Sequence, residues 1–198
     1  MLVTLGIIGV VSAMTMPTLM QNHQKKTYVV QLHKVYNEAQ QVALQYMTDS
    51  NALNLSEAGI SSQSKTNEFV TKYFKVVQTC ENQLTPCFAQ QYKIIGGNVV
   101  SGIVNVNAYV LASGASISAL YSKENDKVIN IMVDINGQKG PNILGRDMFF
   151  MALYNNGIID TRSSDAATPP LTEEQRDSAS VNWKPFADIL NDNWEMTY

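Results

Sequence analysis

The amino-terminal stretch from Met1 to Gln21, MLVTLGIIGVVSAMTMPTLMQ, decides how the rest of this chain can fold. It carries no charged side chain, and the first formal charge of the sequence is Lys25. A helix of this length measures about 30 Å, which matches the thickness of a bilayer core. We therefore expect residues 1–21 to form a helix that lies in a membrane or in an equally apolar setting.

Three other interpretations of this stretch compete with a helix built for assembly. A cleaved secretory signal would start with positive charge, and none precedes Leu2. A buried core helix that is apolar on all sides would need a larger protein around it. A plain single-span anchor fits better, but it has no need of Pro17, which removes a backbone donor and crowds the carbonyl of Ala13. Gly6, Gly9 and Ala13 share one face, where another helix could approach closely.

Residues 2–26, LVTLGIIGVVSAMTMPTLMQNHQKK, resemble the amino-terminal helix of type IV pilin-like proteins, which include the pseudopilins of type II secretion systems. In that family a prepilin peptidase cuts a Gly-Phe-Thr-Leu-x-Glu motif just before the apolar run. The resemblance implies that this sequence is truncated just after the motif and that the peptidase is a partner of the full-length precursor. It also implies an inner-membrane protein with a periplasmic head, or an extracellular filament. Its partners would then be the assembly machinery and other pilin-like subunits.

The composition is typical of an anchored, exported globular protein. The 198 residues are enough for one ordinary domain and a long stem, and 45% hydrophobic with 16% charged residues allow a packed core. A net charge of −3 argues against nucleic acid as a partner. Lys25 and Lys26 follow the apolar run, where basic residues favour the cytoplasmic side, so processing would have to decide the orientation.

The helix is expected to continue over residues 22–50 as an amphipathic stem. Apolar residues recur there in steps of three and four, which places them in a stripe on one side of the helix. The stripe consists of Val29, Leu32, Tyr36, Ala39, Ala43 and Tyr46. The polar residues 48–51 should end the helix. The first half should therefore leave the domain, and the second half should lie against it.

Residues 51–198 are predicted to form one globular head domain, which gives an α+β fold with the long helix packed on a small antiparallel sheet. After a polar loop, a second helix is expected over residues 66–77, with Thr66 as its cap. Strands are predicted over residues 108–112, 116–121, 128–134, 148–153 and 158–160. Because successive strands have short connections, such as Ser113-Gly114, they should form a meander whose one face the stem covers.

The end of the chain is predicted to close the domain. Residues 161–177 are polar and are expected to form a loop, and residues 182–198 should dock on the head. The docking groups would be Trp183, Phe186, Ile189, Leu190 and Trp194.

Cys80 and Cys87 are the two cysteines of the chain. Their spacing is not that of a C-x-x-C redox or zinc site, and no second pair exists to complete a tetrahedral metal. In an exported protein the pair is expected to form a local disulfide. The alternative is two reduced, unrelated thiols.

The segment Asp134–Asp147, DINGQKGPNILGRD, resembles a D-x-N-G-x-x-G-P-N-x-x-G-x-D loop of secretion-associated pilin-like proteins. Its glycines, proline and Asx residues are those of a tight connection between strands. A sharper hypothesis is a calcium site that uses Asp134, Asn136 and Asp147, although the spacing does not fit an EF-hand. The plain structural loop is favoured, and no other cofactor is expected.

The motifs of catalysis are missing from the sequence. It has no nucleophile elbow, P-loop or dinucleotide-binding glycine pattern, so an enzyme is not expected. The favoured function is a structural subunit of a type IV pilus-like or type II secretion pseudopilus filament. The alternative is a membrane-anchored, exported binding or adhesin domain that does not polymerise.

Overall fold

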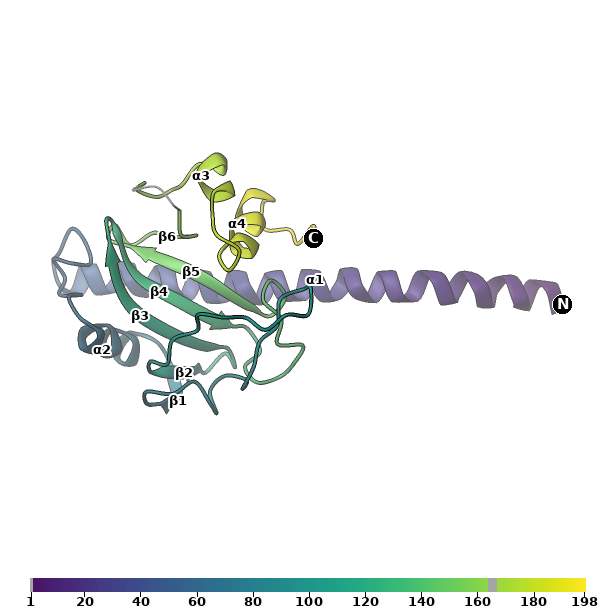
Figure 1. Cartoon of the computed structure of the whole chain (residues 1–198), viewed down its shortest axis with the longest axis horizontal. Coiled ribbons are helices and arrows are strands. Elements are labelled where there is room, and N and C mark those ends of the chain that lie inside the picture. The colour runs from purple at the N-terminus through teal and green to yellow at the C-terminus, as the bar shows by residue number, and fades with distance from the viewer. Residues whose placement is uncertain (1, 164–166) are drawn as a thin grey trace.

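A long helix, α1 (Leu2–Asp49), projects far beyond a small head in the computed structural model of the protein (Figure 1). The structure describes residues 2–163 and 167–198, with side chains from Thr15 onward except Thr18. The remaining elements all belong to the head. They are α2 (Gln63–Tyr73), β1 (Val76–Cys80), β2 (Ala108–Leu111), β3 (Ser116–Glu124), β4 (Lys127–Asp134), β5 (Met148–Tyr154), β6 (Ile159–Asp160), α3 (Glu173–Asp177) and α4 (Lys184–Asn191).

The expected α+β architecture is confirmed, with α1 lying along a six-stranded antiparallel sheet. The strands follow one another in sheet order from β1 to β6, which is the predicted meander. In the β2–β3 hairpin Val110 pairs with Ser116, and Gly114 has a φ of +87° in the turn between them. Such a φ suits glycine because it has no Cβ. The Ser113-Gly114 turn was therefore correctly predicted.

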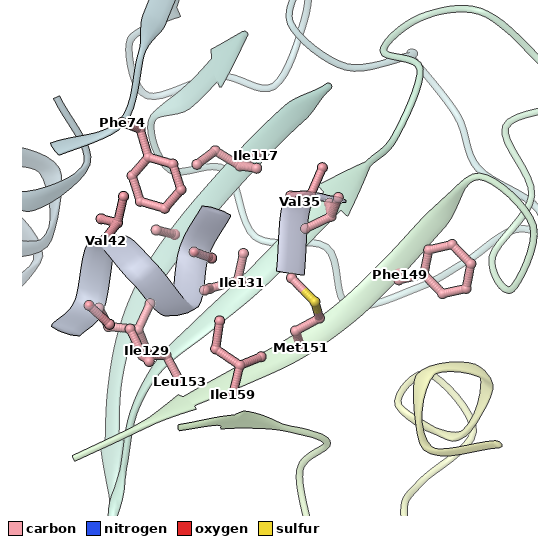
Figure 2. Close-up of a cluster of buried hydrophobic side chains, with 14 of the residues drawn as sticks. Val35, Val42, Phe74, Ile117, Ile129, Ile131, Phe149, Met151, Leu153 and Ile159 are labelled. Carbon is pink, nitrogen blue, oxygen red and sulfur yellow. The ribbon is translucent and has the colours of Figure 1, made fainter. Parts of the chain in front are cut away.

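The stem of α1 covers one face of the sheet and forms the main core with it (Figure 2). Alternate residues of the central strands point toward the helix, among them Ile117, Ile131 and Phe149. The buried residues of the stem are Val29, Leu32, Val35, Ala39, Val42, Ala43 and Met47. The expected apolar stripe does face the sheet. Tyr36 and Tyr46 are only partly buried, and Val35 and Val42 take the deeper positions.

The helix ends where the polar residues predicted it would. Asn51 has a φ of +50°, a left-handed conformation that Asn tolerates better than most residues. Its backbone N–H donates to the carbonyl of Thr48 at 3.0 Å, and the N–H of Ser50 donates to that of Tyr46 at 3.1 Å. These bonds satisfy carbonyls that the last helical turn would otherwise leave without partners.

The prediction for the second helix was wrong at both ends. The helix α2 begins at Gln63, and Ser62 is its cap, because the Ser62 hydroxyl accepts from the N–H of Lys65 at 3.3 Å. Thr66 is instead buried inside the helix, and its hydroxyl donates back to the Ser62 carbonyl at 3.1 Å. The chain then becomes extended, and residues 76–80 form β1 through pairing with β2.

The end of the chain is more ordered than predicted. The expected polar loop over residues 161–177 contains α3, which Thr172 and Gln175 cap reciprocally. The closing segment docks as expected, since Phe186 and Ile189 are fully buried. Its Trp194 stacks on His33 of the stem, with ring centroids 3.9 Å apart.

Candidate functional site

The part of α1 before the stem projects beyond the head (Figure 1). From Thr15 to Thr27 the described side chains are exposed, apart from a half-buried Lys25. Met16, Leu19 and Met20 expose 60%, 67% and 66% of their surface. Burial against the head begins only at Tyr28 and Val29. Residues 22–27, which the sequence assigned to the packed stem, therefore lie before the start of burial.

The residues predicted for helix assembly are only partly visible as side chains. Gly6, Gly9 and Ala13 are in the helix, but the exposure of the face they share lies outside what the structure describes. Pro17 is exposed, and α1 continues through it as one helix. Over the residues described, no helix combines the length and apolar character needed to cross a membrane.

The two cysteines form the predicted disulfide, which pins the loop after β1 to the sheet. Cys80 and Cys87 have their Cα atoms 6.1 Å apart and are 3% and 1% exposed. The Ser116 hydroxyl of β3 donates to the carbonyl of Cys87 at 2.5 Å. Phe88 and Tyr92 continue from this point into a second apolar cluster. The disulfide therefore anchors the segment that covers one end of the sheet's second face.

The loop between β4 and β5 is organised by its two buried carboxylates. Both oxygens of Asp147 accept backbone N–H groups, from Asn142 and Ile143, at 2.7 Å each. One oxygen of Asp134 accepts from the Tyr92 hydroxyl, and the other accepts from the backbone N–H of Asn136 at 3.1 Å. Both carboxylates thus hold the chain in its turn, which is the structural role that the sequence analysis favoured.

Burial sets the protonation of these carboxylates. It raises the pKa of Asp134 to about 7, and the hydrogen bond from Tyr92 only partly opposes it. Burial also raises the pKa of Asp147 above its ordinary value, although the backbone bonds from Ile143 and Asn142 favour the charged form. A cation binds the ionised form of a carboxylate. Where burial makes ionisation unfavourable, the positive charge of the cation has to offset that cost.

The loop offers few free oxygen atoms to bind calcium. The Asn136 amide is best placed with its nitrogen facing the Lys139 carbonyl at 2.7 Å and Asp134 Oδ1 at 2.9 Å, so it acts as a donor. Within the described ranges, no three or more His, Cys, Asp or Glu side chains come together where they could hold a metal. That Asp134, Asn136 and Asp147 bind no calcium stays a prediction.

The sequence analysis missed a cavity of about 320 Å³ on the face of the sheet opposite α1. Its floor comes from β3, β4 and β5, and one of its walls includes Asn182 and Trp183. The one available signal was Asn130, a polar residue in the middle of the apolar β4 sequence KVINIMVD. The walls gave no signal because they come from irregular segments distant in the sequence.

The function of the chain has to be inferred from its own geometry. No protein-family model matches the chain, and no curated protein and no solved structure matches it. Two features remain to be explained in functional terms. They are the exposed apolar half of α1 and the cavity on the second face of the sheet.

Proposed function

We propose that the chain is a structural subunit of a type IV pilus-like filament or a type II secretion pseudopilus. Its helix would be held in the inner membrane before assembly, with the head in the periplasm, and would later pack among the helices of other subunits. One observation carries this proposal. The 48-residue helix α1 leaves its first half outside the head while its second half is part of the core (Figure 1).

The exposed apolar residues supply the physical reason for a partner. Removing apolar surface from water is favourable by about 25 cal/mol per Å². Contact with lipid or with another helix would therefore lower the free energy of the exposed Met16, Leu19 and Met20 side chains. The sequence before them is uncharged and includes Gly6 and Gly9, small residues that permit close approach of helices. A helix that exchanges lipid for neighbouring helices would use both properties.

Two features of the head are compatible with the proposed route. The Cys80–Cys87 disulfide suits a compartment that is oxidising, such as the periplasm. The core of the head is complete from Val29 onward, so the head does not depend on the first half of the helix for its packing. The helix could therefore move between membrane and filament without unfolding the domain.

A crosslinking experiment in cells that make the protein would test the proposal. A photoreactive residue would replace Leu19, which is 67% exposed on the projecting helix. The matched control would carry it at Leu53, which is 89% exposed on the head beyond the end of α1. A filament subunit should give chain-to-chain crosslinks at Leu19 in the sheared filament fraction and far fewer at Leu53.

The same experiment addresses the alternative, a membrane-anchored binding domain that does not polymerise. An isolated anchor would crosslink from Leu19 to lipid, and its chains would stay monomeric in the membrane fraction. The cavity on the second face of the sheet favours retaining this alternative, because a binding domain needs such a site. Chain-to-chain crosslinks that are equal at both positions would contradict a specific role for the helix.

A further inference from the structure

The second face of the sheet is covered from two sides and left open between them. The disulfide-linked loop packs Phe88 and Tyr92 over one part, and Trp183 packs on Ala152 and Tyr154 over another. The two covers meet where the Asn182 side-chain amide donates to the Ser101 carbonyl at 3.2 Å. The space of about 320 Å³ between them falls in the range of about 300–1,000 Å³ found for small-molecule sites.

The floor of this cavity holds a buried polar atom that has no partner. Asn130 lies in β4, between Leu120 of β3 and Ala152 of β5. Its Oδ1 is buried and accepts no hydrogen bond in the described part of the chain. An unsatisfied buried acceptor is unfavourable, and a turn of the Asn130 amide toward the cavity would let this oxygen accept a hydrogen bond from a ligand.

The charges around the cavity favour a neutral ligand. Arg162 is the one ionisable side chain among the described lining residues, and its Nη2 pairs with Glu124 at 2.8 Å. The other polar lining groups are amides, hydroxyls and the indole N–H of Trp183, and they include Ser118 and Asn182. A charged ligand would therefore find no unpaired charge of opposite sign in the cavity. A neutral ligand rich in hydroxyl groups could instead form hydrogen bonds with the amides and hydroxyls of the lining.

The remaining lining is apolar and partly aromatic. Leu120, Met132 and Phe150 project from the floor, and the ring of Phe150 lies 5.6 Å from that of Trp183. A sugar ring has a face of C–H groups and a rim of hydroxyl groups. Such a molecule would place its C–H face on the apolar side chains and a hydroxyl donor at Asn130.

We propose that this cavity is a binding site for a neutral carbohydrate. An extended peptide fits the site less well, because peptides usually add to a strand edge and this floor is the face of three central strands. The proposal goes beyond filament assembly and does not depend on it, since one chain supplies all the named groups. A filament subunit and a non-polymerising binding domain could equally carry the site.

The proposal is tested with the full chain in a detergent that has no sugar headgroup. A printed array of neutral glycans, acidic glycans and peptides would identify a ligand class, and the soluble form of the bound glycan would then be titrated. The chain has two tryptophans. Trp194→Phe leaves Trp183 of the cavity wall as the reporter, because Trp194 packs instead on His33 and Tyr36.

Neutral glycans should bind and change the fluorescence of Trp183 to saturation. Asn130→Leu, which keeps a similar volume and removes the acceptor, should weaken binding at least tenfold. Asn98 is exposed in the covering loop (residues 81–107) and does not line the cavity, so the Asn98→Leu variant should bind like the parent. Thermal melts would show that both variants are folded, and the Trp183 titration of the parent stands even if Asn130→Leu is not. Absence of neutral-glycan binding, binding of acidic glycans or peptides alone, or equal binding by a folded Asn130→Leu variant would overturn the proposal.

Discussion

Asp134 is the residue whose chemistry departs furthest from what its position in the sequence suggested. A carboxylate at the start of a glycine-rich loop is usually exposed, yet this one is fully buried beside Tyr92. Only the folding of the covering loop brings Tyr92 to it, across 42 residues of sequence. The local turn could therefore be predicted from Gly137, Gly140 and Pro141, whereas the buried pair could not.

Changing Asp134 to Asn should flatten the dependence of stability on pH. Burial raises the folded-state pKa of Asp134 from 3.8 to about 7. Between these values the folded chain binds more protons than the unfolded chain, so the free energy of unfolding falls as pH rises. From about 1.4 kcal/mol per pKa unit, the parent should lose roughly 2–4 kcal/mol between pH 4.5 and pH 7.5.

Denaturant unfolding of both proteins across this pH range provides the measurement. Asp134→Asn should lose less stability, and above pH 7 it should be at least as stable as the parent, because it removes a buried charge. Asp147 also has a raised pKa, so some pH dependence should persist. Parallel curves for the two proteins would show that Asp134 is not the group that titrates.

The disulfide makes a second prediction at the residue scale. Cys80 and Cys87 are seven residues apart, and closing a loop of this length stabilises a fold by about 2–3 kcal/mol. Replacing both cysteines with Ser should lower the free energy of unfolding by at least this amount, because the covering loop loses its anchor. Urea unfolding of the parent with and without a reductant is the control. Equal stability of reduced and oxidised parent would contradict a structural role.

At the scale of elements, the stem of α1 was predictable because its pattern is repetitive. Apolar residues in steps of three and four indicate a helix face whatever the rest of the chain does. The error lay in which residues go deepest, since Val35 and Val42 are buried while Tyr36 and Tyr46 lie at the edge. That choice depends on the shape of the sheet, which the helix sequence does not contain.

Packing of the stem on the sheet should dominate the stability of the head. Leu32 is fully buried, and Leu32→Ala should lower the free energy of unfolding by about 2–5 kcal/mol. Val30 is two residues away on the same helix but 68% exposed, so Val30→Ala should change it by no more than about 0.5 kcal/mol. Urea unfolding measures both. Similar effects for the two variants would mean that the stem is not held against the sheet as described.

Short elements were harder to predict than the long helix. Residues 76–80 continue the apolar pattern of α2, and only pairing with β2 makes them a strand. The helix α3 has five residues in a polar segment, where no hydrophobic pattern marks it. Its Arg176 makes two bonds of 2.9 Å to the buried Asp160, a contact of the folded chain that sequence reasoning had no way to see.

Pro17 makes a prediction for the projecting half of α1. The helix continues through this residue, although an interior proline costs about 3 kcal/mol through a lost hydrogen bond and a steric clash. Pro17→Ala should therefore slow amide hydrogen exchange over residues 13–21 and leave membrane insertion unchanged. If assembly uses this weak point, filament yield should fall or filament symmetry should change. Filaments of parental yield and symmetry would refute a specific role for Pro17.

At the scale of the whole molecule, one part of the helix α1 packs on the head and the other part projects from it. The core of the head includes the stem from Val29 onward, and the first half of α1 projects beyond the head (Figure 1) and exposes Met16, Leu19 and Met20. In the sequence, the first half of this helix is apolar on all sides and the second half has one apolar face, which led us to expect a projecting part and a packed part. The sequence could not predict the cavity, because Asn130, Phe150 and Trp183 meet only after the chain has folded.

Electron cryomicroscopy of the filament fraction sheared from cells that make the protein tests the central claim most directly. The account predicts filaments built of this chain, with α1 helices bundled along the axis, heads on the outside, and residues 2–21 buried between subunits. A chain that lacks residues 1–21 should be missing from such filaments while its head stays folded. The account would be contradicted if the full chain were found only as single subunits in the membrane, or in filaments where residues 2–21 contact no other subunit.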